Sequence, residues 1–127
     1  MSPKRTTRPG ISWPRMRRGI RIAVTAFGAD GALAKTTRLP FGEIPGTVLR
    51  DLATMEQFTH GWDLARATGR PADLDPGPTA GLLSQARLAI TDAYRGPNGQ
   101  ALFEPACKAP AGARPADQLA AFLGRAV

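Results

Sequence analysis

The chain has 127 residues, 43% of them hydrophobic, and a formal net charge of +7. This length suits one small domain, and no apolar run approaches the roughly 18 residues that a membrane-spanning helix needs, so we expect no membrane partner. The single cysteine, Cys107, cannot form an internal disulfide, and no secretory signal pattern is present, which together predict a cytoplasmic protein.

The positive charge is concentrated near the N-terminus. Seven of the seventeen Lys and Arg residues lie between Lys4 and Arg21, before the first acidic residue, Asp30, and the remainder of the chain is balanced. Residues 1–14 combine prolines and charges without apolar periodicity and are predicted to form a disordered basic arm. The arm has no interleaved aromatic residues for stacking on bases, and no recognisable DNA-recognition helix follows it, so nucleic acid is not an expected partner.

Two segments in the first half have weak structural signals. The alternation of Ile20, Ile22 and Val24 within residues 15–27 is compatible with a strand, and the same residues are compatible with a short helix. Residues 36–41 form a short extended candidate between loops rich in glycine and proline. This half therefore offers one doubtful helix.

The second half has stronger helical signals. A long helix is predicted from Pro45 or Gly46 to Gly69, whose glycine suits a helix C-terminus. A second helix follows Asp75 and runs to Gly96. Its predicted buried side comprises Leu82, Leu83, Ala86, Leu88, Ala89 and Ile90.

A loop over residues 96–114 precedes a last short helix, which begins at Pro115 and ends before Gly124. An antiparallel bundle needs about four helices to close its core. The predicted fold class is therefore all-α, a partial four-helix bundle over residues 15–127 behind the disordered basic arm.

One stripe of the long helix carries ionisable groups. Advancing about 100° per residue places these residues together: Leu49, Leu52, Ala53, Glu56, His60, Asp63 and Ala67. Because Glu56 and His60 are four residues apart, their carboxylate and imidazole can converge as ligands of zinc or another divalent metal. Asp63 is predicted to orient the imidazole through its other ring nitrogen. The alternative is an ordinary Glu56–His60 hydrogen bond, with Asp63 paired to Arg66.

The stretch LPFGEIPGTVLRDLATMEQFTHGWDLARATGRPADLD, residues 39–75, resembles the mycothiol-dependent maleylpyruvate isomerase metal-binding family of the DinB-like superfamily. The segments THGWDLARATG and QLAAFLGR are highly characteristic, and the resemblance runs from about Leu33 to Arg125, the C-terminal part of that domain. It implies a DinB-like four-helix bundle that holds a divalent metal, usually zinc, through two histidines and one glutamate.

The resemblance also implies that the open metal position binds the small thiol mycothiol, which then adds to an electrophilic substrate. Glu56 and His60 match the second and third ligands of the family. The first has no counterpart, because His60 is the only histidine of the chain. We therefore expect a reading frame that begins late or is shifted. If the chain is active, the resemblance implies a mycothiol-dependent isomerase or thiol transferase.

Two functional hypotheses follow. The first is a metal-binding domain related to thiol-dependent isomerases and S-transferases, with one ligand absent. The alternative is a small basic binding module whose arm, from Lys4 to Arg21, contacts nucleic acid or another anionic surface.

Cys107 is predicted to be an exposed, unpaired thiol rather than a nucleophile. Phe58 and Trp62 lie off the ligand stripe and are predicted core residues.

Overall fold

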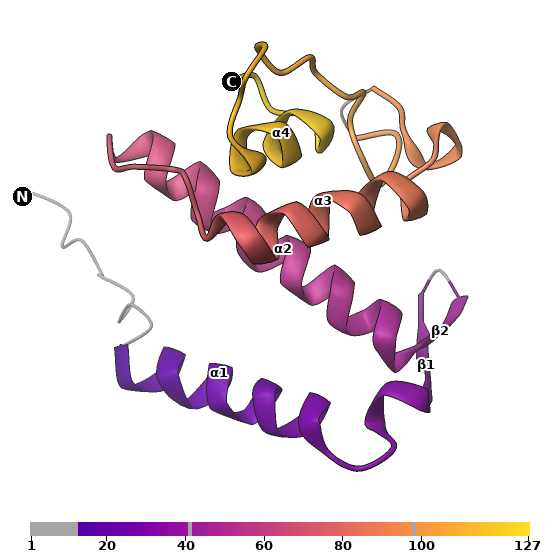
Figure 1. Ribbon diagram of the computed structural model, residues 1–127. Helices are drawn as coiled ribbons and strands as arrows, with labels where there is room; N and C mark the ends of the chain where they lie inside the picture. The colour runs from indigo at the N-terminus through magenta and orange to yellow at the C-terminus, as the bar shows by residue number, and fades with distance from the viewer. Residues whose placement is uncertain (1–12, 41, 98) are drawn as a thin grey trace, which may run out of the picture. The chain divides into compact units, whose positions relative to one another are not determined.

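The computed structural model describes residues 13–40, 42–97 and 99–127 (Figure 1). The chain divides into two compact units, residues 1–50 and 51–127. Most of the predicted basic arm lies outside the described residues, while Trp13 and Pro14 already belong to the first helix, α1. The fold is mostly helical, but it contains a two-stranded sheet, so the prediction of an all-α fold is correct only in its helical part.

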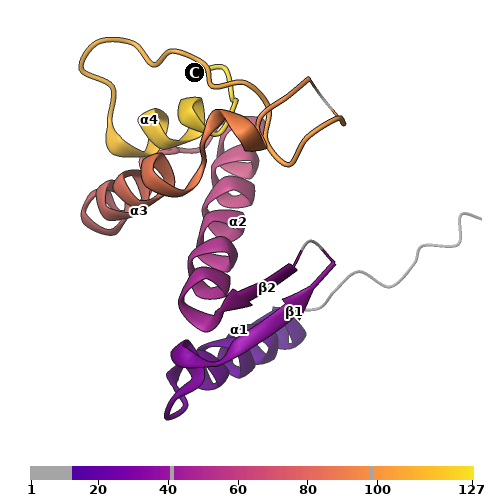
Figure 2. The same cartoon turned by 90° about the vertical axis from the view of Figure 1, so that its right-hand side faces the viewer.

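The first unit contains α1 (Trp13–Gly28), the short 3-10 helix η1 (Ala32–Ala34) and the strands β1 (Thr36–Leu39) and β2 (Gly42–Pro45). The helical alternative for residues 15–27 is thus the correct one. The strands pair antiparallel, with Thr36 opposite Pro45, and Figure 2 shows this hairpin leading directly into helix α2. The second strand escaped prediction because its four residues include a glycine and a proline, both depleted in strands.

Helix α2 (Gly46–Ala67) begins where the sequence predicted and ends in a glycine-dependent turn. Gly69 adopts a left-handed φ of 67°, and the backbone N–H of Arg70 donates to the carbonyl of Ala65 at 2.9 Å. This hydrogen bond, reaching back five residues past a left-handed glycine, is the Schellman form of helix termination. The predicted role of Gly69 is confirmed.

The second unit also contains α3 (Pro76–Ala89), the 3-10 helix η2 (Asp92–Tyr94) and α4 (Pro115–Phe122). The predicted helix from Asp75 to Gly96 is too long, because Ile90 leaves the helical region with φ −98° and ψ 93°. Its β-branched side chain, which disfavours a helix, is buried at 5% exposure. Burial of Ile90 in the core therefore accompanies the end of α3.

The core of this second unit joins α3 and α4, which lie side by side in both views (Figures 1 and 2), with side chains of α2. Its buried members are Met55, Phe58, Trp62, Leu82, Leu83, Ala86, Ile90, Ala116, Leu119, Ala120 and Leu123. Leu88 and Ala89 were expected in this core, but both are exposed, Leu88 at 84%. At about 100° per residue, Leu88 falls on the side of α3 opposite to Leu82 and Ala86.

No helix within the described ranges combines the length and the apolar character needed to cross a membrane.

Candidate metal centre

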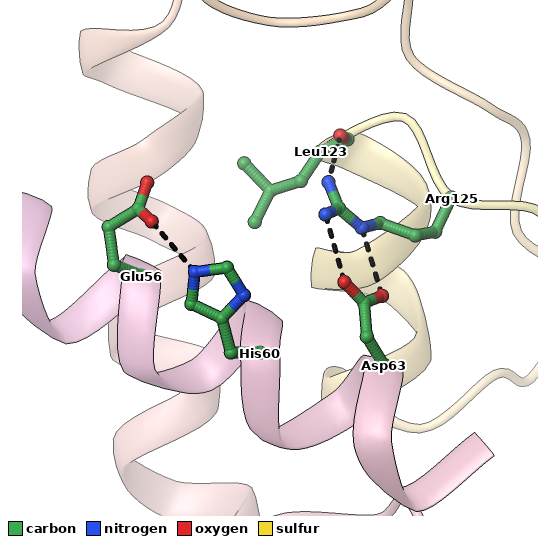
Figure 3. A network of polar contacts seen from close by, with 5 residues as sticks. All are labelled: Glu56, His60, Asp63, Leu123 and Arg125. Atoms are coloured by element: carbon green, nitrogen blue, oxygen red, sulfur yellow. Dashed lines mark hydrogen bonds and ion pairs between the residues drawn. The ribbon is translucent and has the colours of Figure 1, made fainter. Parts of the chain in front are cut away.

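Glu56 and His60 project from the same side of α2, as predicted from their spacing. Oε2 of Glu56 lies 3.1 Å from Nε2 of His60 (Figure 3). The two side chains are 69% and 71% exposed, respectively. Helix α2 buries a different face, so this pair is open to solvent. Their accessibility means that a metal ion can reach both atoms without opening the core.

The buried face of α2 consists of Met55, Phe58 and Trp62. The indole Nε1–H of Trp62 donates to Oδ1 of Asp117 at 3.0 Å, which joins α2 to the first turn of α4. The prediction that Phe58 and Trp62 are core residues is confirmed. Because this face is anchored to α4, the side of α2 that carries Glu56 and His60 has a fixed orientation within the second unit.

Asp63 has a partner that the sequence did not predict. The Nε and Nη2 atoms of Arg125 each donate to a different carboxylate oxygen of Asp63, both at 3.1 Å (Figure 3). Nη1 of Arg125 donates to the carbonyl oxygen of Leu123. The hydrogen bond with Asp63 raises the pKa of the Arg125 guanidinium. Asp63 thus uses both oxygens on Arg125, whereas its predicted partner was the imidazole of His60.

The other predicted partner of Asp63 was Arg66, which lies elsewhere. Its guanidinium carbon is 5.2 Å from the centre of the Trp62 ring, in a cation–π arrangement. The alternative reading of the long helix, in which Asp63 pairs with Arg66, is therefore wrong in that pairing. Its other half, a direct Glu56–His60 hydrogen bond, is present.

Arg125 reaches Asp63 because α4 ends in a second Schellman turn. The backbone N–H of Arg125 donates to the carbonyl of Ala120 at 2.9 Å, and Gly124 has a φ of 95°. A Cβ at Gly124 would lie 2.9 Å from Cβ of Glu104, so a larger residue would have to displace its neighbour. The final Gly-Arg of the QLAAFLGR segment therefore has a structural role. Sequence reasoning missed it because 62 residues separate the two partners.

A small cavity of about 170 Å³ adjoins both polar pairs. Its wall is formed by Leu52, Met55, Glu56, Thr59, His60, Leu102, Phe103, Leu123 and Arg125. Figure 3 shows the Leu123 side chain lying between the Glu56–His60 pair and Arg125. The cavity is smaller than the several hundred Å³ typical of pockets for drug-sized ligands. A cavity of this size can accommodate a metal ion together with a few small molecules or side-chain groups that coordinate it.

In the part of the chain that the structure describes, Glu56 and His60 do not belong to a larger cluster of possible metal ligands. Within residues 13–40, 42–97 and 99–127 there is no group of three or more His, Cys, Asp and Glu residues arranged to hold a metal ion. Cys107 is exposed and unpaired, as predicted, and it lines a different pocket beside Arg87. The described residues thus offer one carboxylate and one imidazole.

Comparison with known proteins found two relatives, both named as uncharacterized proteins of two Mycobacterium tuberculosis strains. Each is 45% identical to this chain over 106 residues, which is 84% of this chain and 57% of the relative. The chain therefore spans little more than half the length of these relatives. No protein-family profile matches the chain, and no solved structure is significantly similar.

Proposed function

We propose that Glu56 and His60 supply two ligands to a divalent metal ion, preferably zinc, and that the domain serves thiol-dependent isomerase or transferase chemistry. The observation that carries the proposal is the 3.1 Å approach of two accessible donor atoms, Oε2 of Glu56 and Nε2 of His60, at the edge of a small cavity. The resemblance of residues 39–75 to the mycothiol-dependent family supports the same pair of ligands. We also place this function in the cytoplasm.

The distance between the two donor atoms fits a shared metal ion. Zinc binds carboxylate oxygen and imidazole nitrogen at about 2.0–2.2 Å. Two atoms 3.1 Å apart subtend an angle of roughly 95° at a point that far from both. This angle lies between the ideal values for octahedral and tetrahedral coordination, so the separation of the two atoms is compatible with a shared ion.

The proposal requires further donors, because catalytic zinc sites usually have three protein ligands and one open position. Two protein ligands alone predict weak binding. In the resembling family a histidine from an earlier helix completes the set, and a thiol occupies the open position. The proposed function therefore depends on a donor beyond the described residues, with the thiol as the exchangeable ligand.

When bound, a divalent metal favours the thiolate form of a coordinated thiol, which is the nucleophilic form. The chain's own residues would prepare the site. To hold the ion, Nε2 of His60 would carry no proton and the ring proton would reside on Nδ1, while the carboxylate of Glu56 would compensate part of the metal charge. The apolar side chains of Leu52, Met55 and Leu123 border the cavity and limit the water around the nucleophile.

Calorimetric titration of the metal-free full chain with zinc tests the ligand assignment. We expect His60→Ala to remove measurable binding and Glu56→Gln to weaken it by at least about tenfold. Glu43→Gln, which removes an exposed carboxylate of β2, is the matched control and should leave binding unchanged. Zinc binding that survives His60→Ala unaltered would overturn the assignment.

A second experiment addresses the thiol. Cobalt(II) in place of zinc gives visible bands that report coordination, and a thiolate ligand adds an intense sulfur-to-cobalt charge-transfer band. The measurement uses the Cys107→Ser background, so that the only thiol is the added one. The band should appear when a small thiol is added and should be absent with His60→Ala. If added thiol leaves the cobalt spectrum unchanged, the thiol part of the proposal is wrong.

A further inference from the structure

Helix α1 has an apolar arc that the other described residues of the first unit leave exposed. At about 100° per residue, six residues fall within an arc of roughly 100°, namely Trp13, Met16, Ile20, Ala23, Val24 and Phe27. No residue of α1 is buried, and Phe27 alone is half-buried. Trp13, Ile20 and Val24 are 60%, 56% and 67% exposed. An apolar face of this kind on one side of a helix normally marks a contact surface.

The remaining surface of α1 carries the four arginines of the helix, together with the exposed Ile22. By the same angular count, Arg17 and Arg21 border the apolar arc, and Arg15 and Arg18 lie further round on the polar side. The helix contains no acidic residue. The guanidinium carbon of Arg17 lies 5.2 Å from the centre of the Trp13 ring, at the boundary between the two faces. The helix therefore combines a continuous apolar arc with four positive charges.

We propose that α1 lies in the plane of an anionic phospholipid surface, with Ile20 and Val24 among the acyl chains and Arg17 and Arg21 at the phosphates. An amphipathic helix with Arg on its polar face and Trp or aliphatic residues on the other binds in this way. The flexible stems of arginines beside the arc allow their guanidinium groups to reach the headgroups while the arc is immersed. This proposal goes beyond the metal-site function and revises the expectation of no membrane partner.

Charge complementarity and the apolar arc together favour lipid over other partners. Nucleic acid would satisfy the arginines, but phosphate contacts leave an exposed arc of Trp13, Met16, Ile20 and Val24 without a function. A second copy of α1 would cover the arc, but it would bring two sets of four arginines together without an acidic residue on either helix. An anionic lipid surface satisfies both faces at once.

Vesicle sedimentation of the full chain provides the first test. We expect binding to vesicles of phosphatidylglycerol and phosphatidylcholine, and much weaker binding to phosphatidylcholine alone, with a decrease as salt rises. The emission of Trp13 should shift to shorter wavelength on binding. Trp62 is buried at 4% exposure and gives a constant background, which the Trp13→Phe variant measures.

Variants separate the two faces of the helix. Replacing both Arg17 and Arg21 by Gln should weaken binding about fivefold for each arginine removed. Ile20→Glu should weaken it by about tenfold or more, because a carboxylate enters the apolar arc. The matched controls are Arg87→Gln and Leu88→Glu on α3, which change an arginine and an exposed leucine outside α1 and should leave binding unaltered. Circular dichroism verifies that each variant is folded.

Several results would overturn the proposal. Equal binding to neutral and anionic vesicles would show that the arginines do not contribute to binding. Full binding by the Ile20→Glu variant would show that the apolar arc does not contribute. Binding to a DNA duplex without binding to anionic vesicles would identify nucleic acid as the partner. If the protein does not bind vesicles but forms a stable dimer, and Ile20→Glu dissociates that dimer, the partner of the arc is a second copy of the chain.

Discussion

Helices α1 and α4 both have an apolar face, and the two faces have opposite environments. In α1, which is 16 residues long, no side chain is buried. In α4, which is 8 residues long, Ala116, Leu119, Ala120 and Ala121 are all buried. The difference arises from the neighbours that each helix has within its own unit, because α4 lies against α3, while α1 contacts mainly the short 3-10 helix that follows it. An apolar stripe therefore shows that a helix has a contact face, and only the partner determines whether that face becomes core.

The largest effect is expected at the centre of the second unit. Leu119 has no exposed surface, so Leu119→Ala should lower the free energy of unfolding by about 3 kcal/mol through lost burial and a residual cavity. Denaturant unfolding followed by circular dichroism measures this change. Leu88→Ala on the exposed side of α3 is the control and should change stability by less than about 0.5 kcal/mol. Equal effects at the two leucines would contradict the assigned core.

A smaller effect is expected where α2 is joined to α4. Trp62→Phe keeps an aromatic ring in the core but removes the Nε1–H that donates to Asp117. The free energy of unfolding should fall by about 1–2 kcal/mol, from the lost hydrogen bond to a charged group and a small volume deficit. The same change in the Asp117→Ala background should have a clearly smaller effect, because the acceptor is already gone. An unchanged effect in that background would show that the hydrogen bond contributes nothing.

The pair of Asp63 and Arg125 should contribute less, because both side chains are more than a third exposed. A double-mutant cycle with Asp63→Ala and Arg125→Ala should give a coupling energy of about 0.5–1 kcal/mol. The pKa of Arg125 is raised in the folded chain, so its contribution is complete below the unfolded-state pKa and declines only as pH rises through the folded value. The coupling energy should therefore be the same at neutral and at mildly alkaline pH.

The sequence predicted local features better than long-range partners. The end of α2 at Gly69 and the common side of Glu56 and His60 follow from local geometry, namely a left-handed glycine and a spacing of four residues. The partner of Asp63 depends on how α4 packs, which no local pattern contains. The exposure of Glu56 and His60 depends on the same packing, because the core of the second unit takes up a different side of α2.

The smallest effect is expected on the uncovered face of α1, and it tests the comparison with α4 most directly. Ile20 is 56% exposed, so Ile20→Ser removes little buried apolar surface and should change the free energy of unfolding by less than about 0.5 kcal/mol. Denaturant unfolding in the absence of lipid measures this value, with Leu119→Ala as the reference for a covered apolar residue. With anionic vesicles present, the same substitution should weaken lipid binding, because the side chain then loses an environment that it has only at the lipid surface. A loss of stability near that of Leu119→Ala, without lipid, would mean that the arc of α1 is covered within the protein. In that case α1 and α4 would be core helices alike, and the apolar arc would already have its partner.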